Sequence, residues 1–168
     1  MRVYLPATFA LLSELANEGV ISARNGWGFT VTPALREFYT SGDEEELEAI
    51  AFDDAAEASL RLLAIGDEEK FPHRRVVISV DVDDAAVTLA DDMGDTVVKL
   101  SPAQVTVDQV AALHIDVAEA ESATAKAIKV IDASDLGDED AELIVGDAQD
   151  NYMAFYDVSE LGVLIDLL

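Results

Sequence analysis

The 168-residue sequence contains no cysteine. This absence excludes disulfide bonds, thiolate metal sites and a cysteine nucleophile, and it favours a reducing compartment. No stretch approaches the roughly 18 consecutive apolar residues of a membrane-spanning helix. The apolar run over 9–12 is cut by Ser13 and Glu14 before it reaches signal-peptide length. We therefore expect a cytoplasmic protein that makes no contact with a membrane.

Basic residues are scarce: ten lysines and arginines stand against 35 acidic residues, which gives a formal net charge of −25. Residues 1–42 carry three charges of each sign, so the whole net charge falls on 43–168, and no lysine or arginine follows Lys129. Such a charge distribution repels phosphate groups and attracts cations or basic partners. We expect no binding to nucleic acid.

Recognisable catalytic motifs are also absent. The sequence has no GxGxxG, P-loop, GxSxG or HExxH spacing, which are the signatures of dinucleotide binding, nucleotide binding, serine hydrolysis and zinc proteolysis. Hydrophobic residues, in contrast, make up 51% of the chain. At this length that fraction predicts a folded core and not a disordered acidic tail.

The order of apolar patterns predicts strands and helices in alternation. Strands are expected over 3–5, ending at Pro6, and over 76–80, whose continuous β-branched residues are typical of a central strand. Thr8 and Gly19 bound one expected helix, and Thr32 caps another that runs to Tyr39. The remaining expected strands are 20–23 and 27–31, paired as a hairpin, 87–89 and 96–100, paired as a second hairpin, 112–117 and 153–156; the remaining expected helices are 43–65, capped by Ser41, 118–133 and 138–147.

This order predicts an α+β fold in which a mixed β-sheet is covered by helices. The whole chain, 1–168, is expected to form a single compact domain. The charged segment 67–72 is where such a domain would subdivide, if it does.

One pair of residues suggests catalysis. His114 and Asp116 lie two apart on an expected strand and so share one face. A carboxylate beside an imidazole can orient a general base. The alternative is that this face is the solvated side of an outer strand. No nucleophile accompanies the pair, so we predict no catalytic residue beyond these two candidates.

A loop containing Asp91, Asp92 and Asp95 is the candidate metal site. Hard cations such as Ca²⁺ and Mg²⁺ take oxygen ligands that converge from a turn. Similar acidic clusters occur at 43–46, 81–84 and 135–140, and none has the spacing of an EF-hand. Solvated turns and helix starts explain the clusters better, because local acidic runs arise easily in so acidic a chain, so no metal or other cofactor is predicted.

Aromatic residues and arginines gather in the neutral segment 1–42. Arg24, Trp27, Arg36, Phe38 and Tyr39 are the candidates for an interface, because such residues are enriched at the energetic centres of protein contacts. They would bind an unknown protein partner or a second copy of the chain. The alternative is that they belong to the core. Arg74 and Arg75, the only basic pair, are expected to pair with neighbouring acids.

Several segments together carry a resemblance that extends over most of the chain. The segments are 3–8 (VYLPAT), 29–37 (FTVTPALRE), 43–48 (DEEELE), 59–63 (SLRLL) and 135–142 (DLGDEDAE). As a set they resemble a family of uncharacterised actinobacterial proteins. The resemblance implies a cytoplasmic actinobacterial protein and names no reaction, cofactor or site residue.

The leading hypothesis is a non-enzymatic binding or regulatory protein whose contact surface is the neutral aromatic segment. The first alternative is an enzyme that uses His114 and Asp116 or a carboxylate-bound divalent metal. The second alternative is an acidic decoy that mimics nucleic acid and occupies a basic DNA-binding protein.

Overall fold

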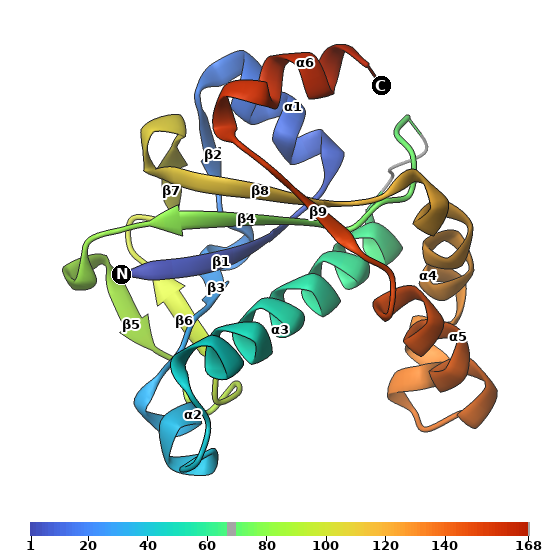
Figure 1. Cartoon of the computed structure of the whole chain (residues 1–168), viewed down its shortest axis with the longest axis horizontal. Helices are drawn as coiled ribbons and strands as arrows, with labels where there is room; N and C mark the ends of the chain where they lie inside the picture. The colour runs from blue at the N-terminus through green and yellow to red at the C-terminus, as the bar shows by residue number, and fades with distance from the viewer. Residues whose placement is uncertain (67–69, 168) are drawn as a thin grey trace.

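A seven-stranded antiparallel sheet forms the centre of the molecule (Figure 1). The computed structural model describes residues 1–66 and 70–167. The strands are β1 (Arg2–Ala7), β2 (Val20–Ser22), β3 (Trp27–Phe29), β4 (Val76–Asp81), β5 (Val87–Leu89), β6 (Val97–Leu100), β7 (Gln104–Thr106), β8 (Val110–Asp116) and β9 (Met153–Tyr156). The helices are α1 (Phe9–Glu18), α2 (Pro33–Phe38), α3 (Glu44–Ile65), α4 (Glu121–Asp135), α5 (Glu139–Gln149) and α6 (Leu161–Asp166).

The strand order in the large sheet is β5-β6-β3-β1-β4-β8-β9, and β2 pairs with β7 in a separate small sheet. The predicted α+β class is confirmed. Every pairing among the described strands is antiparallel, where the sequence predicts a mixed sheet. In the central pair, for example, β4 starts opposite Ala7, at the end of β1, and runs back along it.

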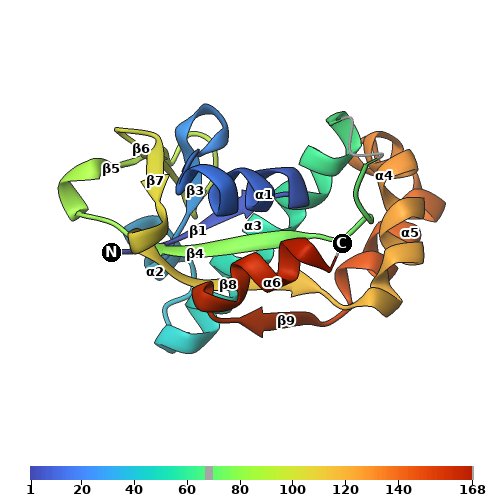
Figure 2. The same cartoon turned by 90° about the horizontal axis from the view of Figure 1, so that it is seen from above.

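The sheet has helices on both faces. Helices α1 and α6 lie together on one face and α3 crosses the other, while α4 and α5 lie at one end (Figures 1 and 2). Alternate residues of β4 pack on opposite faces of the sheet. Val76, Ile78 and Val80 belong to the main core with α1, whereas Val77 packs with the alanines of α3. Burial on both faces explains why this strand is apolar throughout.

One buried serine joins α3 to the sheet. The Ser59 hydroxyl donates to the Ala7 carbonyl at 2.7 Å and accepts from the Val76 N–H at 2.9 Å, and the side chain is fully buried. These two hydrogen bonds therefore hold the C-terminal half of α3 against the adjoining ends of β1 and β4. The apolar contact of α3 with α4 and α5 is centred on the buried Leu60, with Ala64 packed beside it.

Most predicted helix boundaries are confirmed. Thr8 caps α1 through its side chain, Gly19 ends that helix at φ 73°, and Thr32 caps α2. The cap of α3 is Asp43, whose carboxylate accepts from the Glu46 N–H at 2.9 Å, so the prediction of Ser41 is wrong. Ile65 continues the apolar spacing of helix 43–65, which predicts that it is buried, but it is 68% exposed.

Two strand predictions also need correction. Strand β1 continues through Pro6 to Ala7, because β3 pairs with β1 only at Tyr4 and Phe29, and the missing N–H of Pro6 falls where no strand adjoins. The segment 20–23 pairs with β7 and not with 27–31. The turn at Asn25-Gly26, with φ of 54° and 76°, directs the chain from the small sheet into the large one.

The predicted subdivision at 67–72 falls partly on 67–69, which lie outside the described residues. No helix in the described ranges combines the length and the apolar character that a membrane crossing requires.

Candidate functional site

A cleft of about 420 Å³ opens beside Pro6, where β3 separates from β1. We call it the aromatic cleft. One wall is the exposed side of α3; the other is formed by β3 and β6 and by the loop that joins β5 to β6. Its lining residues are Pro6, Arg24, Trp27, Phe29, Asp54, Glu57, Ala58, Arg61, Leu62, Met93, Gly94, Thr96 and Val97.

Trp27 and Phe29 enter the cleft from a strand whose middle residue is glycine. A Cβ at Gly28 would lie 2.6 Å from Val3 Cγ1 and 3.2 Å from Leu5 Cδ2, so the strand packs on β1 with no room for a side chain. Trp27 is half-buried and lies opposite Lys99, whose Nζ is 4.8 Å from the ring centroid. The face of the indole therefore already accepts a cation.

The loop from β5 to β6 frames the cleft on its other side. The Thr30 N–H donates to the Thr96 carbonyl at 2.9 Å, and the Thr32 hydroxyl donates to the Asp95 carbonyl. These bonds hold the loop against the chain that leaves β3. Met93 lies on this loop, lines the cleft and is 59% exposed. The cleft thus combines apolar walls with a few polar groups, which is typical of ligand sites.

Asp54 and Glu57 provide the carboxylates of the cleft, and they differ in their partners. Glu57 accepts from Arg61 at 3.0 Å, and Arg61 also donates to Asp135 at 2.7 Å. Asp54 accepts a 2.6 Å hydrogen bond from the Thr96 hydroxyl. Burial raises the pKa of Asp54 above its usual 3.8; the Thr96 bond opposes the rise, and the charges of Glu57, Asp53 and Asp95 add to it.

The five predicted interface residues fall into two groups. Arg24 and Trp27 line the aromatic cleft. Arg36, Phe38 and Tyr39 lie around α2, where the two rings contact edge to face at 4.8 Å and are 71% and 43% exposed. Arg36 is bound to Glu44 at 2.8 Å. The structure therefore does not gather the five residues into one cleft, and it leaves none of them in the core.

His114 and Asp116 have different partners although both belong to β8. The Nε2 atom of His114 lies 2.9 Å from the Ser79 hydroxyl, and the ring packs against Phe52 and Phe155. Burial, with a smaller contribution from the Arg2 charge, lowers the pKa of His114, so the imidazole is neutral at pH 7. His114 and its neighbours Ser79, Phe52 and Phe155 line a second cleft, of about 380 Å³.

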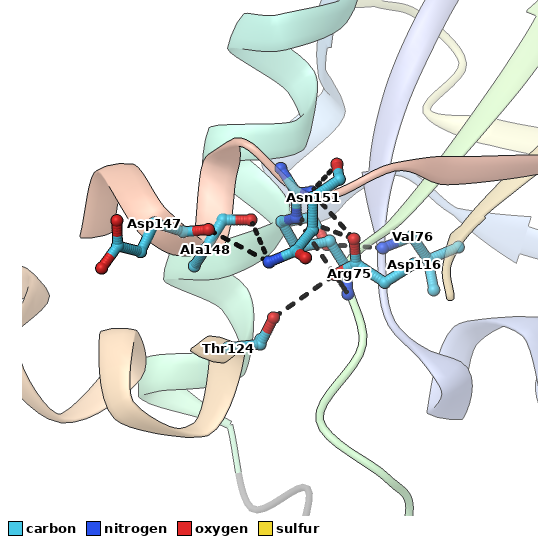
Figure 3. Close-up of polar contacts among 8 residues, drawn as sticks. Arg75, Val76, Asp116, Thr124, Asp147, Ala148 and Asn151 are labelled. Atoms are coloured by element: carbon cyan, nitrogen blue, oxygen red, sulfur yellow. Dashed lines mark hydrogen bonds and ion pairs between the residues drawn. The ribbon is translucent and has the colours of Figure 1, made fainter. Parts of the chain in front are cut away.

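Asp116 is bound to Arg75 in the interior, so the prediction of a solvated face is wrong at this residue. It is 1% exposed, and Arg75 donates to it through the main-chain N–H at 2.8 Å and through Nη2 at 2.8 Å (Figure 3). Thr124 adds a 3.4 Å bond to the same carboxylate, and Arg75 also donates to the Asn151 carbonyl at 3.0 Å. The pair of Asp116 and Arg75 thus joins β8, the residue that precedes β4, α4 and the segment before β9. The expected pairing of Arg74 with an acid is confirmed by its contact with Glu121 at 2.6 Å.

The Ser79–His114 pair has the residue types of a nucleophile and its base. Ser79 lies within the sheet, opposite Tyr4 of β1 and Ala112 of β8. An oxyanion hole needs N–H groups directed at a substrate, whereas the strand around Ser79 uses its N–H groups for pairing. The geometry fits a buried polar contact between strands better than an activated nucleophile.

Comparison with known protein families gives one match. A model described as "Family of unknown function (DUF6912)" matches residues 1–165. The chain belongs to this family. No curated protein and no solved structure matches it.

The acidic loop that was the candidate metal site forms part of the frame of the aromatic cleft. Asp91, Asp92 and Asp95 are exposed on the loop that carries Met93 into the aromatic cleft. Across 1–66 and 70–167, no group of three or more histidine or acidic side chains is arranged to hold a metal ion.

Sequence reasoning missed Asp54, Met93 and Thr96 as residues of the cleft. Asp54 sits in a helix with many acids, which gives it no distinctive sequence signal. The sequence does hold one signal for this wall of the cleft: five residues recur at helical spacing and so share one face of α3. They are Asp54, Glu57, Ala58, Arg61 and Leu62.

Replacing Asp54 with asparagine is expected to stabilise the protein at pH 7. The raised pKa means that ionisation of Asp54 disfavours the folded state above about pH 3.8, and asparagine can still accept the Thr96 bond. The gain should stay below about 1 kcal/mol, because partial solvent exposure screens the charge.

The gain from Asp54→Asn should shrink as the pH falls through the raised pKa and below 3.8, because the Asp54 carboxyl of wild type is then protonated in both the folded and the unfolded state. The groups that face it are Thr96, Glu57, Asp53, Asp95 and Arg61. Urea titrations of both proteins between pH 3.5 and pH 8 would measure the difference. A variant that is less stable than wild type at pH 7 would contradict the prediction.

Proposed function

We propose that the protein is a non-enzymatic binding protein and that the aromatic cleft is its contact site for another protein. The observation that supports this most is the composition of the cleft: the only tryptophan of the chain, further apolar side chains and a partly buried carboxylate line one hollow of about 420 Å³. Concave sites with apolar walls and few polar groups are the usual form of a binding site. Tryptophan is among the residues most enriched at interface hot spots.

The partner that we propose is a protein in the cytoplasm. The net charge of −25 opposes contact with nucleic acid and anionic lipid. The lack of cysteine supports a reducing compartment. The resemblance of the sequence segments supports an actinobacterial source.

Affinity capture with matched variants tests the proposal. Tagged wild type, Trp27→Ala and Phe38→Ala would be expressed in the native cells, and the proteins retained at about 150 mM salt would be compared by mass spectrometry. The expected result is a partner retained by wild type and by Phe38→Ala and reduced at least tenfold with Trp27→Ala.

Phe38→Ala is the matched control, because Phe38 is an exposed aromatic residue of the other interface group. A partner that Trp27→Ala retains as well as wild type does would contradict the cleft as the contact site. Loss with Phe38→Ala alone would instead assign contact to α2. Circular dichroism and melting curves of each variant would separate lost binding from lost folding.

A further inference from the structure

Among residues 1–66 and 70–167, Asp54 is a partly buried carboxylate without a cationic partner. The ion pairs formed within 1–66 and 70–167 use Glu44, Glu57, Asp81, Asp84, Asp116, Glu121 and Asp135, and Asp54 takes part in none of them. Its hydrogen-bond donor in this part of the chain is the neutral hydroxyl of Thr96. Removing a carboxylate from water without a counter-ion costs free energy. A cation that enters the cleft from outside the chain would supply the counter-ion that Asp54 lacks.

The charges that shift the pKa of Asp54 all have the same sign, although Arg24 and Arg61 also line the cleft. Asp53, Glu57 and Asp95 all disfavour its ionisation. Arg61, the nearest arginine along α3, is held by Glu57 at 3.0 Å and by Asp135 at 2.7 Å. The α3 wall therefore presents a negative potential to any group that enters the cleft.

The apolar walls require that the cation be carried on an apolar stem. Trp27, Phe29, Leu62 and Met93 line the space beside Asp54. Lysine and arginine side chains bury their methylene chains on apolar surface and keep a charged end group available for a carboxylate. Arginine also stacks on aromatic rings. The Lys99 ammonium, 4.8 Å from the ring centroid of Trp27, shows that this indole takes part in a cation–π contact within the chain.

We propose that the aromatic cleft binds a lysine or arginine side chain of a basic segment in a partner protein, with Asp54 as the counter-ion. This inference rests on the proposed function and specifies the chemistry of the partner. A protein segment is favoured over a free small cation because it offers apolar side chains to the walls along with several positive charges. Each of those charges is attracted by the −25 net charge of the chain.

Peptide binding followed by tryptophan fluorescence tests the inference. Trp27 is the only tryptophan, so its emission reports on the cleft alone. The probes are three ten-residue peptides in which leucine alternates with arginine, lysine or glutamine, together with free spermidine and agmatine. At about 150 mM salt the arginine and lysine peptides should give saturable changes, at least tenfold tighter than those of the glutamine peptide and of the two small cations.

Three variants separate the site from the general field. Asp54→Asn should weaken binding of the arginine peptide at least tenfold. Asp140→Asn removes the same charge from an exposed position on α5 and should weaken it less than twofold. Arg24→Ala removes a positive residue from the cleft and should not weaken binding, because the occupant is a cation.

Four results would overturn the inference. They are no response to any cationic probe up to millimolar concentration, equal weakening by Asp54→Asn and Asp140→Asn, equal affinity for the glutamine peptide, and binding of agmatine or spermidine as tight as that of the peptides. The proposed function would survive each of these results if Trp27→Ala still abolished capture of the native partner. Retention of that partner by Trp27→Ala would overturn the proposed function instead.

Discussion

Replacing Asp116 with alanine is expected to lower the free energy of unfolding by about 3–5 kcal/mol, because the change leaves the guanidinium of Arg75 buried without its counter-ion. Arg75 is 3% exposed, and the carboxylate that it would lose accepts from its main-chain N–H, Nε and Nη2. For a chain of this length the loss corresponds to a melting temperature lower by roughly 6–20 °C. Urea titration and thermal melting would measure both quantities.

An exposed pair with the same chemistry provides the control. Arg2 donates to Asp81 at 2.7 Å and 3.2 Å, but the two side chains are 48% and 59% exposed. Asp81→Ala should therefore change the free energy of unfolding by less than about 1 kcal/mol. Equal destabilisation by Asp81→Ala and Asp116→Ala would contradict the claim that burial sets the size of the effect.

A double variant tests the mechanism of the loss. Arg75→Met combined with Asp116→Asn removes both charges, and the asparagine can still accept from the main-chain N–H of residue 75. The double variant should be more stable than Asp116→Ala, because a missing pair is less unfavourable than one charge left unpaired in the interior. If it is less stable than Asp116→Ala, the polar contacts with Thr124 and Asn151 carry the stability instead (Figure 3).

Asp116 also shows where reasoning from the sequence reaches its limit. The period of two along the strand correctly separates His114 and Asp116 from Leu113 and Ile115, which lie in the main core. It does not reveal that α3 and α4 cover the other face, nor that Arg75 lies beside Asp116 across 41 positions of sequence. Reasoning from the sequence therefore predicts that a charged residue on that face is exposed to solvent, because the helices that cover it and the residue that pairs with it come from distant segments.

Local signals predicted the elements better than their pairing. Caps such as Thr8 and Thr32 act within one turn of helix, and the hairpin of β5 and β6 closes across a short loop, so both were readable. The pairing of β2 with β7 places Val20 opposite Thr106, and the residues next to either strand carry no sequence signal that predicts this pairing. The same limit applies to the candidate site. Arg24 and Trp27 were predicted from composition, whereas Asp54 joins them only through packing of α3 on the sheet.

The second large effect is expected at Leu60, which anchors the helix pair α4 and α5 to the rest of the molecule. Leu60 is fully buried and packs with Ala127, Ile131, Val145 and Ala148. Leu60→Ala should lower the free energy of unfolding by about 2–5 kcal/mol, because it removes apolar contacts and leaves a cavity. Ile65→Ala, at a position of the same helix that is 68% exposed, should change it by less than about 0.5 kcal/mol.

The loss at Leu60 should also be local. The contacts that it removes join α3 to α4 and α5, whereas the sheet is held by the separate core that contains Val3, Ile78 and Leu113. Hydrogen exchange should therefore accelerate more in α4 and α5 than in β1, β4 and β8, because units with fewer packing contacts open at lower free energy. Uniform acceleration across the sheet and the helix pair would show instead that the two parts unfold as one cooperative unit.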